Sequence, residues 1–158
     1  PGLGCIAGLA GVAGYDFMAA GSEGSIVFGR LEVSNAVQNN RMRKIGRRPQ
    51  VVDKFTLADI AQEDEMRLPS GLRPRWNSLE VDPEQELALL GAENHCMVLI
   101  ALGLRNARQR RVLRIMQLGH GGEAWGLAYH PTMPGLYASA DRRGCVFFWD
   151  AIAKRPLA

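Results

Sequence analysis

Five cations lie within eight residues and form the one charged cluster with an evident partner chemistry: Arg41, Arg43, Lys44, Arg47 and Arg48. Clustered cations bind acidic protein surfaces or nucleic-acid phosphates, and such a run also resembles a nuclear localisation signal. No aromatic residue is interleaved with the run, which disfavours single-stranded nucleic acid as a partner. The alternative is a solvated loop whose charge is neutralised by the acidic run at residues 59–65.

Thiols and imidazoles are the other groups that could do chemistry. His95 adjoins Cys96, but zinc sites pair spacings such as C-x2-C with a second pair, and the sequence has no second pair. We therefore interpret Cys96 and Cys145 as small core residues. With Cys5 they make three cysteines, too few for a disulfide framework and typical of a reducing compartment. We expect no metal, no cofactor and no enzymatic activity, because the sequence also lacks a nucleophile elbow and a phosphate-binding loop that runs into a helix.

The elements that position these residues follow from an internal repeat. Trp76 and Trp125 are 49 residues apart, and so are Cys96 and Cys145. A constant offset near 50 across separate segments is typical of repeat architectures. A Gly-His pair at Gly119 and a Trp-Asp pair at Trp149 lie about 30 residues apart, a spacing that brackets one four-stranded propeller blade. We expect Trp76 and Trp125 to be structurally equivalent, and likewise Cys96 and Cys145.

The repeat divides the chain into four segments. Residues 1–32 are predicted to form a weak blade hairpin (strands b and c), residues 33–75 a charged insertion, residues 76–118 a blade, and residues 119–158 a second blade. Strands are predicted at residues 76–81, 87–90, 97–102 and about 112–116, and again at 124–129, 136–139 and 146–150. Residues 97–102 are continuously apolar, which predicts a strand covered on both faces. Within the insertion, residues 51–57 are a candidate fourth strand and residues 57–66 a short helix; the rest is predicted as surface loop.

Composition fits this organisation without specifying a function. The 158 residues are 47% hydrophobic and 22% charged, as in an ordinary globular domain. The net charge of +3 is well short of that of a dedicated nucleic-acid binder. No stretch reaches about 18 consecutive apolar residues, so no membrane span is predicted. One blade takes roughly 40–45 residues and a closed ring takes several, so we expect an internal piece of a longer protein.

The segment GHGGEAWGLAYHP, residues 119–131, closely resembles the blade start "GH-x-x-E-x-WGLA-x-HP" of the echinoderm microtubule-associated protein-like family of WD-repeat proteins. Residues 89–96 are similar to the hairpin that precedes that blade. The resemblance covers about residues 76–150, and general WD-repeat similarity extends weakly to Tyr15. It implies tandem propellers, association with microtubules and no enzymatic activity. This sequence departs from the pattern at Ala92, where the family has Thr, and in its long charged insertion.

The WD-repeat resemblance also implies a buried hydrogen-bond chain within the last blade. In such blades the Gly-His histidine joins a Ser or Thr on strand b, an Asp in the b–c turn and the Trp of strand c. His120, Ser139 and Trp149 match this pattern. Arg143 occupies the usual Asp position, and Asp141 lies two residues earlier. Either the turn bulges so that Asp141 reaches His120, or this blade lacks the complete chain.

These observations predict an all-β fold, a partial WD-repeat β-propeller with about two to three four-stranded antiparallel blades of a larger propeller. The predicted function is a non-catalytic, microtubule-associated interaction platform in the cytoplasm and cytoskeleton, with the cilium or axoneme as a further location. Tubulin would be bound through the basic run, and the rest of the propeller would come from the same parent chain. Membranes are not expected as partners, and nucleic acid is disfavoured. The alternative is a generic WD-repeat adaptor in a nuclear or ribonucleoprotein complex.

Overall fold

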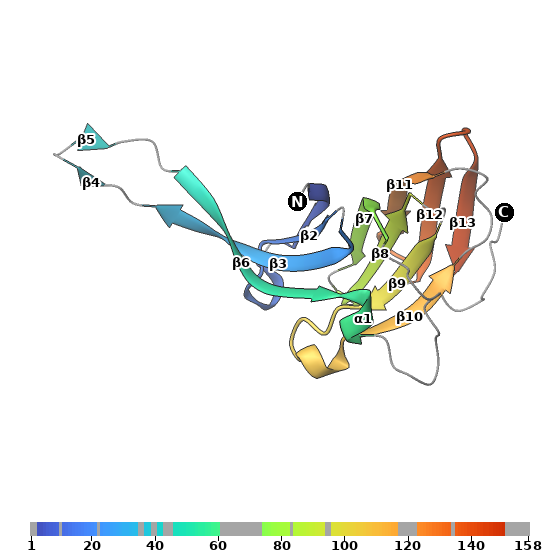
Figure 1. Cartoon of the computed structure of the whole chain (residues 1–158), viewed down its shortest axis with the longest axis horizontal. Helices are drawn as coiled ribbons and strands as arrows, with labels where there is room; N and C mark the ends of the chain where they lie inside the picture. The colour runs from blue at the N-terminus through green and yellow to red at the C-terminus, as the bar shows by residue number, and fades with distance from the viewer. Residues whose placement is uncertain are drawn as a thin grey trace.

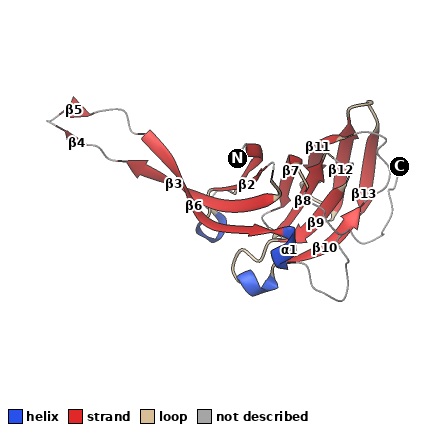
Figure 2. Ribbon diagram, in the orientation of Figure 1, coloured by secondary structure: helices blue, strands red, loops and turns tan. Residues whose placement is uncertain are grey.

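Antiparallel β-strands make up nearly all the regular structure of the protein, as the computed structural model shows (Figure 2). The structure describes residues 3–9, 11–21, 23–34, 37–38, 41–42, 46–60, 74–82, 84–93, 96–116, 123–133 and 135–150. Within these residues three sheets follow one another along the chain and stand side by side, with a thin hairpin projecting from the first of them (Figure 1). The predicted all-β fold class is confirmed.

The first sheet has four strands in the order β1-β2-β3-β6. Their bounds are β1 Leu3–Gly8, β2 Phe17–Gly21, β3 Ser25–Ser34 and β6 Gly46–Thr56. The sequence predicted the hairpin of β2 and β3 and placed a fourth strand within β6, but it missed β1. Two of the six residues of β1 are glycines and only Ile6 is β-branched, so this strand is poor in the β-branched and aromatic side chains that signal a strand.

The second and third sheets carry the repeat. The second sheet consists of β7 Trp76–Asp82, β8 Leu87–Ala92, β9 Met97–Ala101 and β10 Arg111–Met116. The third sheet consists of β11 Ala124–Tyr129, β12 Leu136–Asp141 and β13 Val146–Asp150. All seven strands lie within two residues of their predicted positions. The hydrophobic runs of these strands are bounded by turn residues, which is why the sequence locates them well.

Only three short helical turns interrupt the strands in the described part of the chain: η1 Val12–Gly14, α1 Leu57–Ile60 and η2 Ala107–Gln109. Thr56 precedes α1, and its backbone N–H and hydroxyl both donate to Asp59 Oδ2, at 2.7 and 2.8 Å. These bonds lower the pKa of Asp59, the hydroxyl bond most of all. The helix predicted at residues 57–66 is observed as far as Ile60, and its remainder lies outside the described residues. None of the described helices is long and apolar enough to span a membrane.

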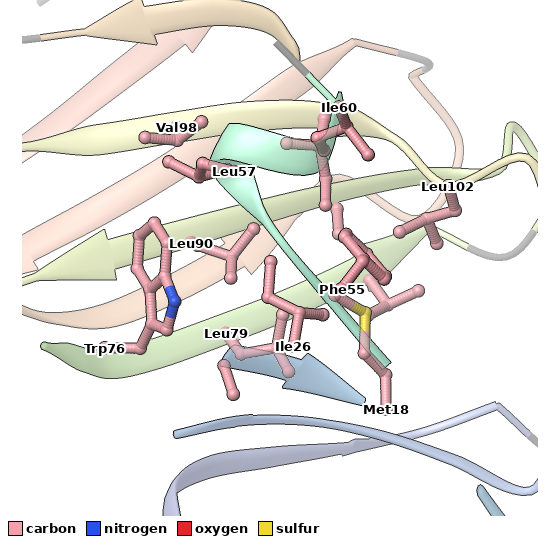
Figure 3. Packing of buried hydrophobic residues seen from close by; sticks show 14 of the residues in the cluster. Met18, Ile26, Phe55, Leu57, Ile60, Trp76, Leu79, Leu90, Val98 and Leu102 are labelled. Carbon is pink, nitrogen blue, oxygen red and sulfur yellow. The ribbon is translucent and has the colours of Figure 1, made fainter. Parts of the chain in front are cut away.

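Two apolar cores separate the three sheets. The core between the first and second sheets contains Phe28, Phe55, Trp76 and Leu90 among its buried residues. Figure 3 shows part of this core, with Phe55, Trp76 and Leu90 labelled. A smaller core between the second and third sheets is formed by Leu89, Met97, Leu99, Ala124, Tyr137 and Trp149. Strand β9 therefore contributes to both cores, which explains its continuous apolar sequence. By contrast, Val146 and Phe148 on β13 are exposed, because no described segment covers the outer face of the third sheet.

Close contacts between neighbouring sheets hold together β1, β7 and β11, the first strand of each sheet, here called the innermost strands. The Ser78 hydroxyl on β7 donates to the backbone oxygen of Ala124 on β11 at 2.9 Å, in a fully buried position. At the other seam, β1 approaches β7 so closely that a Cβ atom on Gly4 would overlap the backbone oxygen of Trp76. The chain therefore needs a glycine at Gly4 for steric reasons. These contacts make the three sheets one packed body.

Arg110 joins the first and second sheets away from the innermost strands. Its Nη2 atom lies 2.8 Å from Asp53 Oδ2 on β6, and its Nε donates to the backbone oxygen of Leu102 at 3.0 Å. The guanidinium carbon also sits 4.1 Å from the ring centroid of Phe55 and 5.1 Å from that of Phe28. A guanidinium within about 6 Å of an aromatic ring centroid is attracted to it. The nearly buried Arg110 side chain thus fastens β6 to the connection between β9 and β10.

Candidate protein-interaction surface

A two-stranded hairpin, here called the arm, projects from the first sheet (Figure 1). It consists of residues 29–34 of β3 paired with residues 46–52 of β6, with β4 (Val37–Gln38) and β5 (Arg41–Met42) paired farther along. The register shifts between Phe28 and Gly29, so the arm begins at a β-bulge. Bulges increase local twist and redirect strands. Most of the insertion that the sequence predicted as surface loop is therefore ordered ribbon where the structure describes it.

The two faces of the arm differ in chemistry. Residues directly opposite each other in an antiparallel pair point to the same face. Leu31 lies opposite Pro49, and Val51 lies opposite Gly29, so these four residues share one apolar face. The other face carries Arg30 opposite Gln50, and Glu32 opposite Arg48, so that face is polar and charged. Leu31 and Val51 are 38% and 57% exposed, which is high for large aliphatic side chains.

The free edge of β6 in the arm is protected against strand addition by Pro49. The Leu31 N–H donates to Asp16 Oδ2 at 2.7 Å, on the side of β3 away from β6. Backbone groups of opposed residues point either toward each other or both away, so the backbone nitrogen of Pro49 also points away from β3. Its missing N–H costs the ribbon no hydrogen bond and removes a donor from the free edge. Partners of the arm are therefore expected to contact side chains rather than extend the sheet.

The structure places three of the five predicted binding cations on the arm. Arg47 and Arg48 are adjacent residues of β6 and are both exposed, so their side chains project from opposite faces of the ribbon. Arg41 begins β5. Arg43 and Lys44 lie outside the described residues. The sequence recognised the cluster but not the ribbon that carries it, although the valines at positions 51 and 52 and the turn-forming pair Asn39-Asn40 are hairpin signals.

The acidic run does not neutralise the arm within the described residues. Asp59, its first member, belongs to α1 and is engaged by Thr56. Ile60 ends that helix, and residues 61–65 lie outside the described part of the chain. The one opposed charge pair in the described ribbon is Glu32 with Arg48. Because Glu63, Asp64 and Glu65 lie outside the described residues, the interpretation of the basic run as a loop neutralised by the acidic run stays a prediction.

Two members of the predicted hydrogen-bond chain meet in the third sheet. Trp149 Nε1 on β13 donates to the Ser139 hydroxyl on β12 at 2.6 Å, and both residues are buried. Asp141 ends β12 and accepts the backbone N–H groups of Arg143 and Cys145, each at 2.9 Å. The turn is closed by a glycine at φ 85°, Gly144, whose N–H donates to the backbone oxygen of Asp141.

Asp141 therefore organises the turn of this hairpin. Being two residues apart on one strand, Ser139 and Asp141 present their side chains to the same face of the third sheet, and both are buried. Arg143, at the usual Asp position of the family pattern, is exposed on the turn. His120 lies outside the described residues, so its place in the hydrogen-bond chain stays a prediction.

The predicted equivalence of Trp76 and Trp125 is wrong by one residue. Trp76 pairs with Ala92, and Ala124 pairs with Asp141, so Trp76 corresponds to Ala124. Trp125 occupies the bulged position that follows and is 55% exposed, whereas Trp76 is buried. The indole N–H of Trp125 donates to Glu123 Oε2 at 3.0 Å. Trp76 is thus a core residue and Trp125 a surface residue.

The predicted equivalence of the two later cysteines is confirmed. The backbone oxygen of Cys96 accepts from Ala92 N, and that of Cys145 accepts from Asp141 N, each just before the third strand of its sheet. Cys96 is buried as predicted, whereas Cys145 is exposed, so the interpretation of Cys145 as a core residue is wrong. Burial raises the pKa of Cys96 and of Cys5 to about 11, so both remain protonated thiols at neutral pH.

His95 lies outside the described residues. Among the residues that the structure describes, no three His, Cys, Asp or Glu side chains gather as metal ligands would.

A second polar cluster lies at the seam between the second and third sheets. Glu80 on β7 accepts the backbone N–H of Tyr129 on β11, but burial outweighs this bond and raises the pKa of Glu80 above its usual range. Tyr137 on β12 is buried, and its hydroxyl has no hydrogen-bond partner among the described residues. Burial raises the pKa of Tyr137 to about 12, and the carboxylates of Asp82 and Glu80 add to this. The seam thus holds carboxylates and a phenol at some cost in stability.

We expect the substitution Glu80→Gln to stabilise the protein near neutral pH. The raised pKa means that the folded state keeps the Glu80 proton to higher pH than the unfolded state, so stability falls as pH rises from about 4.5 through the folded pKa. Glutamine keeps an acceptor for the Tyr129 N–H without the charge. Thermal unfolding between about pH 4 and pH 8 should show a gain that is largest at neutral pH and vanishes in acid. Exposed Glu84→Gln is the control; an equal gain there, or a pH-independent gain, would contradict the assignment.

Comparison with solved structures identifies the fold. The chain is similar to the WD40 repeats of RRP9, with a TM-score of 0.63 at 13% identity, over 99% of this chain and 37% of that one. It is also similar to a chain of apo ctPRC2 in an autoinhibited state, with a TM-score of 0.54 at 18% identity, over 89% of this chain and 26% of that one. The three sheets therefore correspond to successive blades of a partial WD-repeat β-propeller. At these identities the likeness concerns the fold alone.

Sequence comparison adds no closer relative. No protein-family model and no curated protein sequence matches the chain. The expected membership of the echinoderm microtubule-associated protein-like family is thus not confirmed, whereas its coarser part, a WD-repeat propeller, is.

Proposed function

We propose that this chain belongs to a non-catalytic WD-repeat scaffold that associates with microtubules and uses the arm to bind an acidic protein surface. The observation that carries the proposal is a basic ribbon standing clear of the blades (Figure 1). The segment of residues 30–54 contains seven Lys or Arg and two Asp or Glu, a net charge of +5. The whole chain carries +3, so the remainder carries −2. Among the described residues of this segment, Arg30, Arg47, Arg48 and Lys54 are exposed, so a partner can reach their positive charge.

A binding role fits the chemistry of the described side chains better than a catalytic role. Partial or full burial keeps the Cys5 and Cys96 thiols protonated, and Glu80 and Tyr137 lie in the seam between the second and third sheets. Nucleophiles and general bases in enzymes are instead positioned together with matched pKa values. Tubulin is the proposed acidic partner, because its exposed surface is strongly acidic.

The double substitution Arg47→Gln/Arg48→Gln should weaken binding to microtubules about three- to tenfold at low ionic strength, since exposed ion pairs contribute roughly 0.2–1 kcal/mol each. The effect should shrink as salt is added, because salt screens exposed charges. Co-sedimentation of the purified protein with microtubules across a salt series measures both quantities.

The matched control is Arg142→Gln/Arg143→Gln, which removes an adjacent pair of exposed arginines from the β12–β13 turn. This control should bind as the unsubstituted protein does. Equal losses from both double variants would show that net charge alone attracts the partner. Absence of binding at low salt would remove tubulin as the partner.

The alternative, an adaptor in a nuclear or ribonucleoprotein complex, draws on the same basic run. Neither of the two similar structures is described as a microtubule-associated protein, which weakly favours this alternative. The two functions differ in cell location. Imaging of the tagged protein on the cytoskeleton would support the first, and imaging in the nucleus would support the second.

A further inference from the structure

We propose that the apolar face of the arm, formed by Leu31, Pro49 and Val51, is itself a contact surface for a folded acidic protein. The contact would consist of an apolar centre with an ion pair between Arg47 and a partner carboxylate at its margin. This inference rests on the proposed function and names the part of the arm that determines binding strength. The proposed function requires only that the cations of the arm attract an acidic partner.

The apolar face of the arm is exposed without structural need. Phe28 and Phe55 fill the core side of the first sheet, and the pairing of β3 with β6 extends beyond them to Ser34 and Gly46. Beyond the bulge at Gly29 both faces of the ribbon are solvent-accessible, as the exposed residues Leu31, Gln50 and Val51 show. A two-stranded ribbon is only marginally stable in water on its own, so exposed aliphatic side chains on one face are unfavourable unless a partner covers them.

A partner would bind a face of the arm rather than the free edge of β6. Pro49 removes a donor from the free edge, so a partner does not add a strand there. It must therefore contact a face, and the two faces differ: one carries Leu31, Pro49 and Val51, and the other carries Arg30, Glu32, Arg48 and Gln50. An apolar centre with charges at its margin is the usual anatomy of a protein–protein interface. Arg47, opposite Val33 at the far end of the apolar face, supplies a cation at that margin.

Charge disfavours a second copy of this chain as the occupant of the apolar face. Two arms laid face to face would bring two segments of net charge +5 together, and like charges at close range oppose association. An acidic surface on the apolar face removes this repulsion and pairs with Arg47. Duplex nucleic acid would also satisfy the cations, but its backbone offers no apolar area for Leu31 and Val51. The combination of charge and apolar area therefore favours an acidic protein.

The test separates the apolar contact from the electrostatic one. The variant Leu31→Thr/Val51→Thr places a strand-favouring β-branched residue at both positions and replaces apolar area by hydroxyl groups. We expect it to weaken binding to microtubules about tenfold, as loss of a buried aliphatic pair does in interfaces. The same factor should hold at low and high salt, because apolar contacts are not screened. Gln50→Thr, on the opposite face, is the control and should leave the affinity unchanged.

The outcomes distinguish this inference from the proposed function. If Arg47→Gln/Arg48→Gln weakens binding while Leu31→Thr/Val51→Thr does not, the arm binds by charge alone and the inference is overturned. If the threonine variant lowers the unfolding midpoint without changing affinity, a neighbouring blade covers this face and the inference is also overturned. Tighter binding of the protein to duplex RNA than to microtubules would overturn it as well. If the unsubstituted protein does not bind microtubules, the proposed function itself fails.

Discussion

The substitution Gly4→Ala is expected to cause the largest loss of stability. A Cβ atom at this position would overlap the backbone oxygen of Trp76 and lie 3.0 Å from that of Ala20. Backbone atoms of packed strands cannot rotate away as a side chain can, so β1 and β7 would have to separate. Overpacking of cores typically costs about 1–3 kcal/mol, and we expect about 3 kcal/mol or more here.

A change of that size should lower the thermal midpoint by roughly 6–12 °C for a chain of this length. Gly8→Ala is the matched control on the same strand, because no atom lies within 4 Å of the position its Cβ would take. Scanning calorimetry of the two variants measures the difference. Equal midpoints for Gly4→Ala and Gly8→Ala would show that the innermost strands are not in the close contact described above.

The second large effect is expected for Arg110→Met, which keeps an unbranched side chain and removes the guanidinium. The loss leaves Asp53 without its partner and Phe28 and Phe55 without the cation. Removing one member of a buried pair typically costs 3–5 kcal/mol. The Asp53 side chain is one-third exposed and stays partly hydrated, so we expect a smaller loss of about 2–3 kcal/mol, below that range.

Urea unfolding of Arg110→Met, Asp53→Asn and the double variant forms a double-mutant cycle that isolates the pair. Arg108→Met, an exposed arginine on η2, serves as the control and should be nearly neutral. A coupling energy near zero would assign the effect to the aromatic contacts. No effect of Arg110→Met at all would contradict the fastening role of this residue.

The sequence predicted the second and third sheets well because packing imposes a pattern on them. Met97 to Ala101 is continuously apolar since β9 faces two cores, and such runs are visible in any single sequence. The misplacement of Trp125 has a local cause. Strands β7 and β11 align at an offset of 48 residues, whereas the following strands align at 49, so one residue is added in the connection between them. Pro83 and Pro131 are 48 residues apart, which is the offset of β7 and β11. The alignment of the two repeats was based instead on Trp76 and Trp125, which are 49 residues apart.

The arm could not be predicted in the same way. A ribbon exposed on both faces has no core beside it to impose an alternation of apolar and polar residues, so the pattern that reveals most strands is weak. The charge of the segment was evident from Arg41 to Arg48. Its division into an apolar and a polar face depends on the register of Leu31 with Pro49 and on the bulge at Gly29. This register depends on how the two strands pair in the folded protein, and it cannot be predicted from the residue types of the segment alone.

The reach of the arm has a kinetic consequence. Residues 46–51 of β6 alone span roughly 20 Å at about 3.3 Å per residue. Electrostatic fields decay over about 8 Å at physiological ionic strength, so the far end of the arm lies beyond the influence of the mildly acidic body of the chain. An approaching acidic surface would therefore meet the positive ribbon first and be oriented by it before it touches a blade. Shortening the ribbon should slow association while leaving the lifetime of the complex nearly unchanged, whereas the apolar face should govern that lifetime.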